Sequence, residues 1–351
     1  MSEEIPPIVK ARDVVVEFQL RRPSPFASRP VLRAVDRVSF EIARGETLGL
    51  VGESGSGKST TGRAVLRLED LQQGTVEYDG VDITHYQQKR LKGIRRRMAM
   101  VFQDPYSSLD PSMIIANIIG EPLDVHENLS RSDREDRITE ALRRVHLPAD
   151  YMHRYPHEFS GGQRQRIAIA RAIVTEPRLI AADEAVSSLD VSTQSQVINL
   201  FQELQAEMEM AYLFIAHDLA LVQRVSDRIA VMYLGQIVEQ GPSDAVSERP
   251  AHPYSAALQS AVPYPHPRVQ RERERIILPG DQPSPIDPPD GCRFHNRCPW
   301  VMDICRTTEP IHTPLNSGGT VACHLQTDGP ELRGEPLPTL APADSQSFVR
   351  R

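Results

Sequence analysis

The chain has 351 residues, of which 40% are hydrophobic, and a formal charge of −7 from 47 acidic and 40 basic side chains. This length and apolar content support a substantial buried core and argue against disorder as the default state. The acidic balance provides no broad positive field for a nucleic-acid backbone, so no nucleic-acid partner is expected. No run of about 18 consecutive apolar residues occurs, so a role at a membrane would require partner chains.

The first strands expected along the chain lead into a glycine-rich turn. Apolar runs rich in β-branched residues lie at 14–18, 38–42 and 47–51, and residues 59–68 then fit a helix, which gives the order strand, phosphate loop, helix. Further short apolar runs lie at 98–102, 179–182, 212–216 and 229–233. Because these runs alternate with helix-like stretches, we expect an α/β core with parallel strands.

Two regions depart from this alternation. Between Asp104 and Tyr155 the pattern becomes amphipathic and helical, at 113–119 and 134–145, which predicts a helical insert extending over about 104–175. From about Ser243 proline becomes dense, which predicts a separate and irregular C-terminal appendage. The end of the chain, 331–351, is expected to be a flexible tail. No internal repeat is visible, so the chain has one nucleotide-binding unit.

The N-terminus and the cysteines indicate the compartment. The start, MSEEIPPIVKARD, lacks the basic residues and apolar stretch of a secretory signal, which predicts a cytosolic location. All four cysteines lie in the last fifth of the chain. In a reducing compartment this clustering indicates a metal or cluster site more than disulfides. The residues are Cys292, Cys298, Cys305 and Cys323.

The strongest signal is a phosphate-binding loop. The run GESGSGKS at 52–59 fits G-x-x-x-x-G-K-[ST] at every defined position, after a strand and before a helix. Backbone N–H groups of such a loop converge on phosphate oxygens, and the helix N-terminus favours negative charge. Lys58 should reach the terminal phosphates, and the Ser59 hydroxyl can bind Mg²⁺. The predicted ATP-binding residues here are Glu53, Ser54, Gly55, Ser56, Gly57, Lys58, Ser59 and Thr60.

Two adjacent acidic residues follow the apolar run at 179–182. A P-loop requires a further carboxylate on the metal side, and Asp183 is the candidate for Mg²⁺. Glu184 comes directly after it, where a carboxylate could act as general base toward the water that attacks the γ-phosphate. We therefore predict Mg-ATP hydrolysis.

The run FSGGQRQR at 159–166 resembles the signature motif of ABC ATPases. A turn of small residues that opens a helix can hold a phosphate, and the same Ser160 hydroxyl would also cap the helix. The resemblance implies that Ser160, Gly162 and Gln163, with Gly161 in the same turn, contact ATP bound to the P-loop of a second nucleotide-binding subunit.

Other residues resemble the remaining family elements in the expected order. Gln103 is similar to the glutamine that binds Mg²⁺ and the attacking water and connects them to the helical insert. Ser188-Leu189-Asp190 resembles the loop that crosses the dimer interface. His217 resembles the switch histidine that contacts the γ-phosphate and positions Glu184, a role for which imidazole offers a donor at neutral pH.

Two positions fit the family less closely. Phe18 is the candidate for stacking on adenine, because a flat apolar ring gains by covering the base, although a core position is the alternative. After Glu184 the family usually has proline, whereas Ala185 and Val186 follow here. The absence of proline affects the expected stiffness of this loop. It does not affect the assignment of its two acidic residues.

Further runs narrow the resemblance to the ATPases of oligopeptide/dipeptide importers. They are GETLGLVGES at 45–54, YPHEF at 155–159, MYLG at 232–235 and HPY at 252–254. The resemblance implies a P-loop core with a parallel sheet, an antiparallel β subdomain, the helical insert and the cysteine-bearing appendage. The implied domains are an ABC ATPase domain over 1–242 and a C-terminal region over 243–330.

The cysteine region resembles the C-terminal region of the same importers. Its spacing, C-x5-C-x6-C-x17-C, is wider than that of common zinc knuckles, and four thiolates can hold either a [4Fe–4S] cluster or a structural zinc. The resemblance favours the iron–sulfur cluster over Zn²⁺, with free or disulfide-forming thiols as a further alternative. A structural role is favoured over electron transfer, because nothing else in the sequence indicates a redox partner.

The family resemblance implies a motor subunit at the cytoplasmic face of the inner membrane. It would work with a second ABC ATPase subunit and two transmembrane permease subunits, and indirectly with an extracytoplasmic substrate-binding protein. Peptides are the expected cargo, with nickel, glutathione or oligosaccharide as alternatives. A soluble ABC ATPase of translation or DNA repair usually carries two nucleotide units or a long coiled-coil insertion, and neither is visible. A regulatory module that binds nucleotide without turnover is a third possibility.

Overall fold

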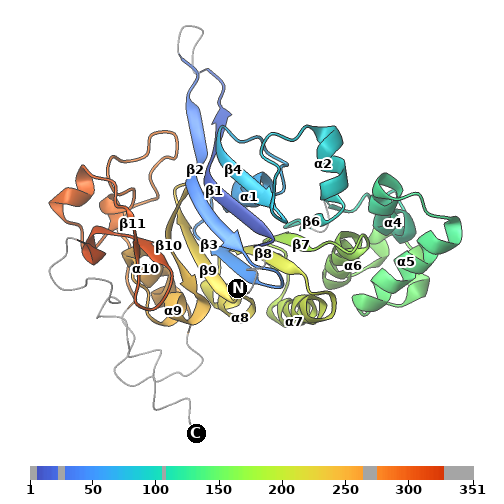
Figure 1. Ribbon diagram of the computed structural model, residues 1–351. Helices are drawn as coiled ribbons and strands as arrows, with labels where there is room; N and C mark the ends of the chain where they lie inside the picture. The colour runs from blue at the N-terminus through green and yellow to red at the C-terminus, as the bar shows by residue number, and fades with distance from the viewer. Residues whose placement is uncertain (1–5, 23–27, 105–107, 264–274, 328–351) are drawn as a thin grey trace, which may run out of the picture. The chain divides into compact units, whose positions relative to one another are not determined.

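The computed structural model describes residues 6–22, 28–104, 108–263 and 275–327 (Figure 1). The chain divides into two compact units, each built from separate stretches of sequence. The first unit takes the described residues up to 12, then 40–47 and 61–216. The second takes 13–39, 48–60 and the described residues from 217 onward. The predicted tail at 331–351 lies outside the described residues.

A four-stranded sheet has the order β2-β1-β4-β5. The apolar runs predicted at 14–18 and 38–42 belong to longer strands, β1 (Val9–Gln19) and β2 (Val31–Ile42). Strands β4 (Gln73–Tyr78) and β5 (Val81–Asp82) form an antiparallel hairpin. Its two-residue turn, Asp79-Gly80, has positive φ at both positions, as the twist of such hairpins requires.

The first unit contains three parallel strands. Strand β7 (Leu179–Asp183) lies between β6 (Met98–Val101) and β8 (Ala211–Ala216), with Met98 paired to Leu179 and Asp183 paired to Ile215. Every residue of β7 and β8 is buried, which explains their continuous apolar sequences. Helix α7 (Val191–Met208) contributes Phe201, whose ring packs in T-shaped pairs with Tyr212 and Phe214.

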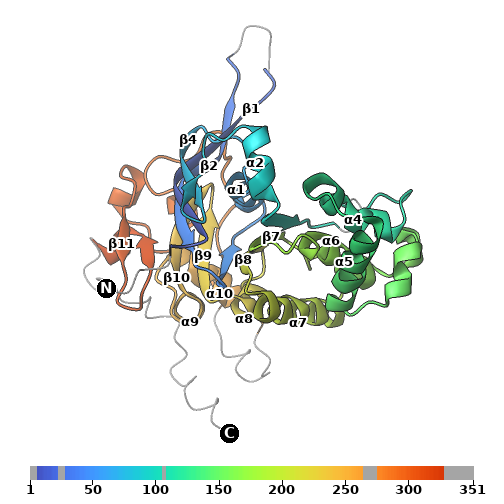
Figure 2. The same ribbon diagram turned by 45° about the vertical axis from the view of Figure 1, so that its right-hand side comes forward.

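Helices make up the part of this unit that was predicted as an insert. The expected segments at 113–119 and 134–145 correspond to α4 (Ile115–His126) and α5 (Arg131–Arg144). Both pack against α6 (Gly161–Ile173), and Figure 2 shows the three together. Two short 3-10 helices, η1 (Ala149–His153) and η2 (Pro156–Glu158), lie between α5 and α6. A further helix, α2 (Gln88–Arg95), precedes β6.

The second unit is organised around strand β9. Strand β3 (Thr47–Val51) pairs in parallel with β9 (Arg228–Tyr233), with Leu48 opposite Arg228. Strand β10 (Gln236–Pro242) is antiparallel to β9, with a bulge between Ile237 and Glu239. Next come β12 (Thr320–Ala322) and β11 (His312–Pro314), both antiparallel. The C-terminal region therefore continues the sheet.

The C-terminal region has more regular structure than its proline content predicts. Besides α8 (Leu219–Val225), the unit has α9 (Ser243–Glu248) and α10 (Pro253–Ala261). Pro253 is tolerated because it occupies the first turn of α10, where its missing N–H has no helical partner to lose. Short 3-10 helices follow at η3 (His295–Arg297), η4 (Asp303–Arg306) and η5 (His324–Gln326). None of the described helices is long and apolar enough to cross a membrane.

Candidate nucleotide-binding site

The phosphate loop joins β3 to α1 (Lys58–Val65). Gly55 and Gly57 have φ of 81° and 103°, and residues with a Cβ atom rarely adopt such positive values. A Cβ at Gly52 would lie 2.1 Å from the Met232 carbonyl oxygen, and one at Gly57 would lie 2.2 Å from the Ala34 carbonyl oxygen. At Gly52 and Gly57 the loop backbone is therefore packed too closely against its neighbours for a residue with a side chain.

Lys58 is buried inside this loop, with 4% of its surface exposed. Its Nζ donates to the carbonyl oxygens of Gly52 and Glu53, both at 2.8 Å. The two carbonyl dipoles therefore hold the ammonium group of Lys58 within the loop. A phosphate bound by the loop would offer this cation a fully charged partner, which forms a stronger hydrogen bond than a carbonyl oxygen.

The two predicted acids lie at the end of β7 in the first unit. Asp183 is 4% exposed, and Glu184 follows it in a left-handed backbone conformation with φ of 46°. The Glu184 N–H donates to the Ile215 carbonyl oxygen at 2.9 Å, which holds this unusual conformation. Gln103 Nε2 donates to Glu184 Oε2 at 2.8 Å, although 81 positions separate them. The structure therefore brings two of the predicted catalytic residues together.

The signature turn caps helix α6. Ser160 Oγ accepts from the Gln163 N–H at 3.4 Å, and the Gln163 side chain accepts from the Ser160 N–H at 3.0 Å. A Cβ at Gly162 would lie 2.5 Å from Thr193 Cγ2, at the start of α7. Asp190, in the predicted interface loop, caps α7 by accepting from the Thr193 N–H at 2.9 Å. The signature turn thus lies against the start of α7, the helix that this loop caps, within one unit.

The remaining predicted residues are placed as follows. Phe18 is half-buried on β1, outside the fully buried core, and His217 is exposed directly after β8. Lys58, Ser59, Thr60 and His217 belong to the second unit, whereas Gln103, Asp183 and the signature residues belong to the first. The joint action of these two groups on one nucleotide stays a prediction.

A groove of about 260 Å³ in the first unit is lined in part by Phe102, the residue before Gln103. Its wall includes Met98 and Phe102 near β6, Pro122 of α4, and Ala168 and Arg171 of α6. Phe102 is 40% exposed, which is high for a phenylalanine, and it directly precedes Gln103. The groove therefore lies between the helical part of the unit and the strand end that precedes a candidate catalytic residue. The sequence analysis did not identify it, because its residues come from five separate stretches of the chain.

The four cysteines lie near one another in the second unit. The Cys292 N–H donates to the Cys305 carbonyl oxygen at 2.8 Å, and Cys305 and Cys323 are buried. Burial, together with the neighbouring Cys305 thiol, raises the pKa of Cys292 to about 11 and that of Cys298 to about 12. Burial and the other three thiols also raise the pKa of Cys323. Among the described residues, which include all four cysteines, no group of three or more His, Cys, Asp or Glu side chains is placed to hold a metal ion.

Comparison with known proteins decides the family. The family model of ABC transporters matches residues 35–187, and that of the oligopeptide/dipeptide transporter C-terminal region matches residues 238–305. The oligopeptide transport ATP-binding protein AppF of Bacillus subtilis is 48% identical over 321 residues, covering 91% of this chain and 97% of AppF. The chain belongs to the oligopeptide/dipeptide family of ABC transporter ATP-binding subunits. The soluble ABC ATPases of translation and DNA repair are therefore disfavoured.

Other relatives agree with this family. The "Probable peptide ABC transporter ATP-binding protein y4tS" of Sinorhizobium fredii is 51% identical over 297 residues, covering 85% of this ABC ATPase and 84% of the relative. A solved dimeric ATP-binding cassette, in a post-hydrolysis state with ADP and Pi, has a TM-score of 0.60 and 27% identity, covering 67% of this chain and 98% of that chain. CbiO1 of Clostridium perfringens, part of an ABC transporter complex, has a TM-score of 0.60 and 26% identity, with coverages of 69% and 90%. The predicted α/β P-loop fold is confirmed.

Proposed function

We propose that this ABC ATPase hydrolyses Mg-ATP to drive the import of peptides through membrane partner subunits. The hydrogen bond from Gln103 to Glu184, beside the buried Asp183, is the observation that carries the proposal. It orients one oxygen of the predicted general base, as a reaction that removes a proton from water requires. The relatives named for peptide and oligopeptide transport support the choice of cargo.

The proposed chemistry assigns a separate task to each group. The loop N–H groups and Lys58 bind the phosphates, and Ser59 and Asp183 supply the hydroxyl and carboxylate oxygens that Mg²⁺ prefers. Bound Mg²⁺ neutralises charge on the phosphates. Glu184 accepts the proton of the attacking water, and His217 donates a hydrogen bond to the γ-phosphate.

A second ATPase subunit completes the proposed site. The capped turn of α6 presents backbone N–H groups and Ser160 at a helix N-terminus, a favourable place for a phosphate bound to another chain's P-loop. The dimeric solved relative supports this arrangement. ATP binding would close two subunits around two nucleotides, and hydrolysis would reopen them.

The substitution Glu184→Gln tests the ATPase assignment. It keeps the side-chain shape and removes the basic oxygen, so ATP binding should persist while kcat falls by about 10²-fold or more. The matched control is Glu135→Gln, which makes the same chemical change at an exposed position of α5. Undiminished hydrolysis by Glu184→Gln would contradict the assignment.

We further propose that an apolar segment of a permease subunit docks in the groove that contains Phe102 and Arg171. This groove touches β6, α4 and α6, so a partner seated there could transmit movement to Gln103. Phe102→Ser should reduce co-purification with the membrane subunits and leave ATP binding by the isolated subunit unchanged. Such a complex would form at the cytoplasmic face of the inner membrane.

Peptide cargo is tested by uptake rather than by ATPase assays. Cargo is selected by the permease subunits and an extracytoplasmic binding protein, so this subunit carries no cargo site of its own in the proposal. A deletion strain should lose uptake of labelled di- and oligopeptides. Retained peptide uptake, with loss of nickel, glutathione or oligosaccharide uptake, would change the cargo and leave the ATPase proposal intact.

The proposed occupant of the cysteine site is a [4Fe–4S] cluster. The thiols of Cys292, Cys298 and Cys305 lie close enough to that of Cys323 to interact with it electrostatically, and four thiolates can hold such a cluster, with a structural Zn²⁺ as the alternative. The cluster would crosslink three segments of the C-terminal region as a structural element. Anaerobic purification, visible spectroscopy and iron and zinc analysis test the proposal. Colourless, iron-free protein under these conditions would contradict it.

A further inference from the structure

The turn at residues 291–298, hereafter the cysteine turn, is firmly anchored in the second unit. Gly291 has φ of 63°, and a Cβ there would lie 2.5 Å from the Cys305 carbonyl oxygen. Phe294 is 1% exposed, with its ring centroid 5.2 Å from that of Tyr233 and 5.4 Å from that of Tyr254. Such packing fixes the directions in which the neighbouring polar side chains can point.

Arg297 extends from the cysteine turn to the phosphate loop. Its Nη1 donates to Glu53 Oε2 at 2.8 Å and its Nη2 donates to Glu53 Oε1 at 3.2 Å, a two-pronged ion pair. The Glu53 N–H donates to the Tyr254 hydroxyl at 2.8 Å. Both the side chain and the backbone of this loop residue are therefore held by the C-terminal region.

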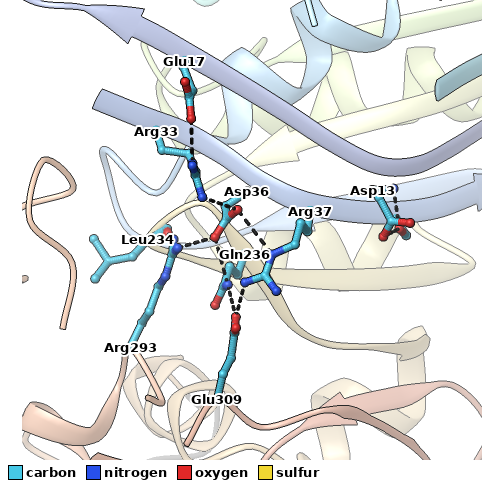
Figure 3. A network of polar contacts seen from close by, with 10 residues as sticks. Asp13, Glu17, Arg33, Asp36, Arg37, Leu234, Gln236, Arg293 and Glu309 are labelled. Atoms are coloured by element: carbon cyan, nitrogen blue, oxygen red, sulfur yellow. Dashed lines mark hydrogen bonds and ion pairs between the residues drawn. The ribbon is translucent and has the colours of Figure 1, made fainter. Parts of the chain in front are cut away.

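Arg293 provides a second connection, shown in Figure 3. It donates to the Leu234 carbonyl oxygen and to the carboxylate of Asp36, which is 2% exposed. The Asp36 N–H donates to the Gly235 carbonyl oxygen, and the Gly235 N–H donates to the Ser56 carbonyl oxygen, both at 2.8 Å. This chain of contacts ends in the same loop, three residues after Glu53.

Ion pairing by Arg297 has a direct consequence for a bound triphosphate. Glu53 is the residue after the first glycine of the loop, so its carboxylate stands close to the phosphate-binding backbone. An unpaired carboxylate there would repel the phosphates, whereas the guanidinium neutralises it. The pair is mostly shielded from water, with side-chain exposures of 10% and 31%, so its electrostatic effect is weakly screened.

We propose that Arg297 is a positioning residue for nucleotide binding, which acts by holding and neutralising Glu53 of the phosphate loop. This inference rests on the proposed ATP site. It makes the C-terminal region a working part of that site, because the cysteine turn sets where the guanidinium lies. The predicted effect is on ATP affinity, since Arg297 contacts the loop and none of the reacting atoms.

The experiment measures equilibrium binding of a fluorescent ATP analogue, and ATPase kinetics, for the intact protein. Arg297→Ala should raise Kd by about tenfold and leave kcat at saturating ATP within about twofold. Arg297→Lys keeps the positive charge but cannot form the two-pronged ion pair. Its Kd should therefore lie between those of the wild type and of Arg297→Ala. The matched control, Arg249→Ala, removes an exposed arginine from the same family region and should change neither quantity.

A double-mutant cycle separates this role from a general effect on folding. In the Glu53→Gln background, Arg297→Ala should change Kd by less than about twofold, because the charge it neutralises is gone. An equal loss in both backgrounds, or no loss in either, would overturn the inference. If Arg297→Ala does not fold, the same cycle with Arg297→Lys decides. Failure of the wild-type protein to bind ATP would instead refute the proposed function.

Discussion

The contact between Gly162 and Thr193 permits a sharp test of how the signature turn is packed. Alanine at Gly162 would place its methyl group 2.5 Å from Thr193 Cγ2, whereas carbon atoms normally meet at about 3.5–4.0 Å. The threonine cannot simply rotate, because its hydroxyl donates to Asp190 at 2.7 Å and would lose that bond. The start of α6 or of α7 must therefore move.

Gly161 supplies the matched control. A Cβ there has no neighbour closer than Leu189 Cδ2 at 3.8 Å, an ordinary contact. Both substitutions replace glycine by alanine in the first turn of α6, so the gain in helix propensity of about 0.5–1 kcal/mol largely cancels between them. What remains is overpacking, which costs about 1–3 kcal/mol. Gly162→Ala should be less stable than Gly161→Ala by that amount.

Urea unfolding followed by far-UV circular dichroism measures the difference. The rescue variant is Gly162→Ala with Thr193→Ser, which removes the obstructing methyl group and keeps the hydroxyl bound to Asp190. It should recover most of the lost stability. Equal stability of the Gly162→Ala and Gly161→Ala proteins would refute the packing argument, as would a double variant no more stable than Gly162→Ala.

Three further predictions concern other parts of the protein. Gly57→Ala should weaken ATP binding by at least about 10²-fold through a backbone clash, whereas Gly45→Ala, also at positive φ but with open space, should leave binding unchanged. In metal-free protein at pH 8, Cys292 and Cys298 should react with iodoacetamide more slowly than after denaturation, because their raised pKa values keep the thiols protonated. The reaction rates of both thiols should increase as the pH rises toward 10. Gln103→Ala should lower kcat by about tenfold and leave ATP affinity within about twofold, in a steady-state assay against the wild type; an unchanged kcat would argue against the contact.

The sequence predicts best where function or burial imposes a local pattern. Strands buried on both faces, such as β7 and β8, are continuous apolar runs, and their positions are confirmed to within a residue or two. By contrast, β5 has two exposed residues and β11 has three residues with no apolar alternation. Their pairing depends on partners elsewhere in the chain, so no local pattern indicates them.

The same distinction applies to the candidate site. The phosphate loop, the acids of β7 and the signature turn are each contiguous, so their residue types suffice to predict them. The pair between Arg297 and Glu53 spans 244 positions, and nothing in the sequence near Arg297 distinguishes it from the other arginines of the chain. Only the fold, which buries Phe294 and thereby directs the cysteine turn, shows that this arginine belongs to the loop.

The long interval between Glu53 and Arg297 has a consequence for synthesis on the ribosome. At about 5–20 residues per second, roughly 12–50 s pass between translation of the glutamate and translation of its arginine. Strand β3 likewise cannot form its parallel pairing until β9 has been synthesised. A truncated chain that ends before the cysteine turn would thus contain every residue of the P-loop motif and still lack the support that shapes it. Truncated products should therefore bind ATP more weakly than the full-length chain.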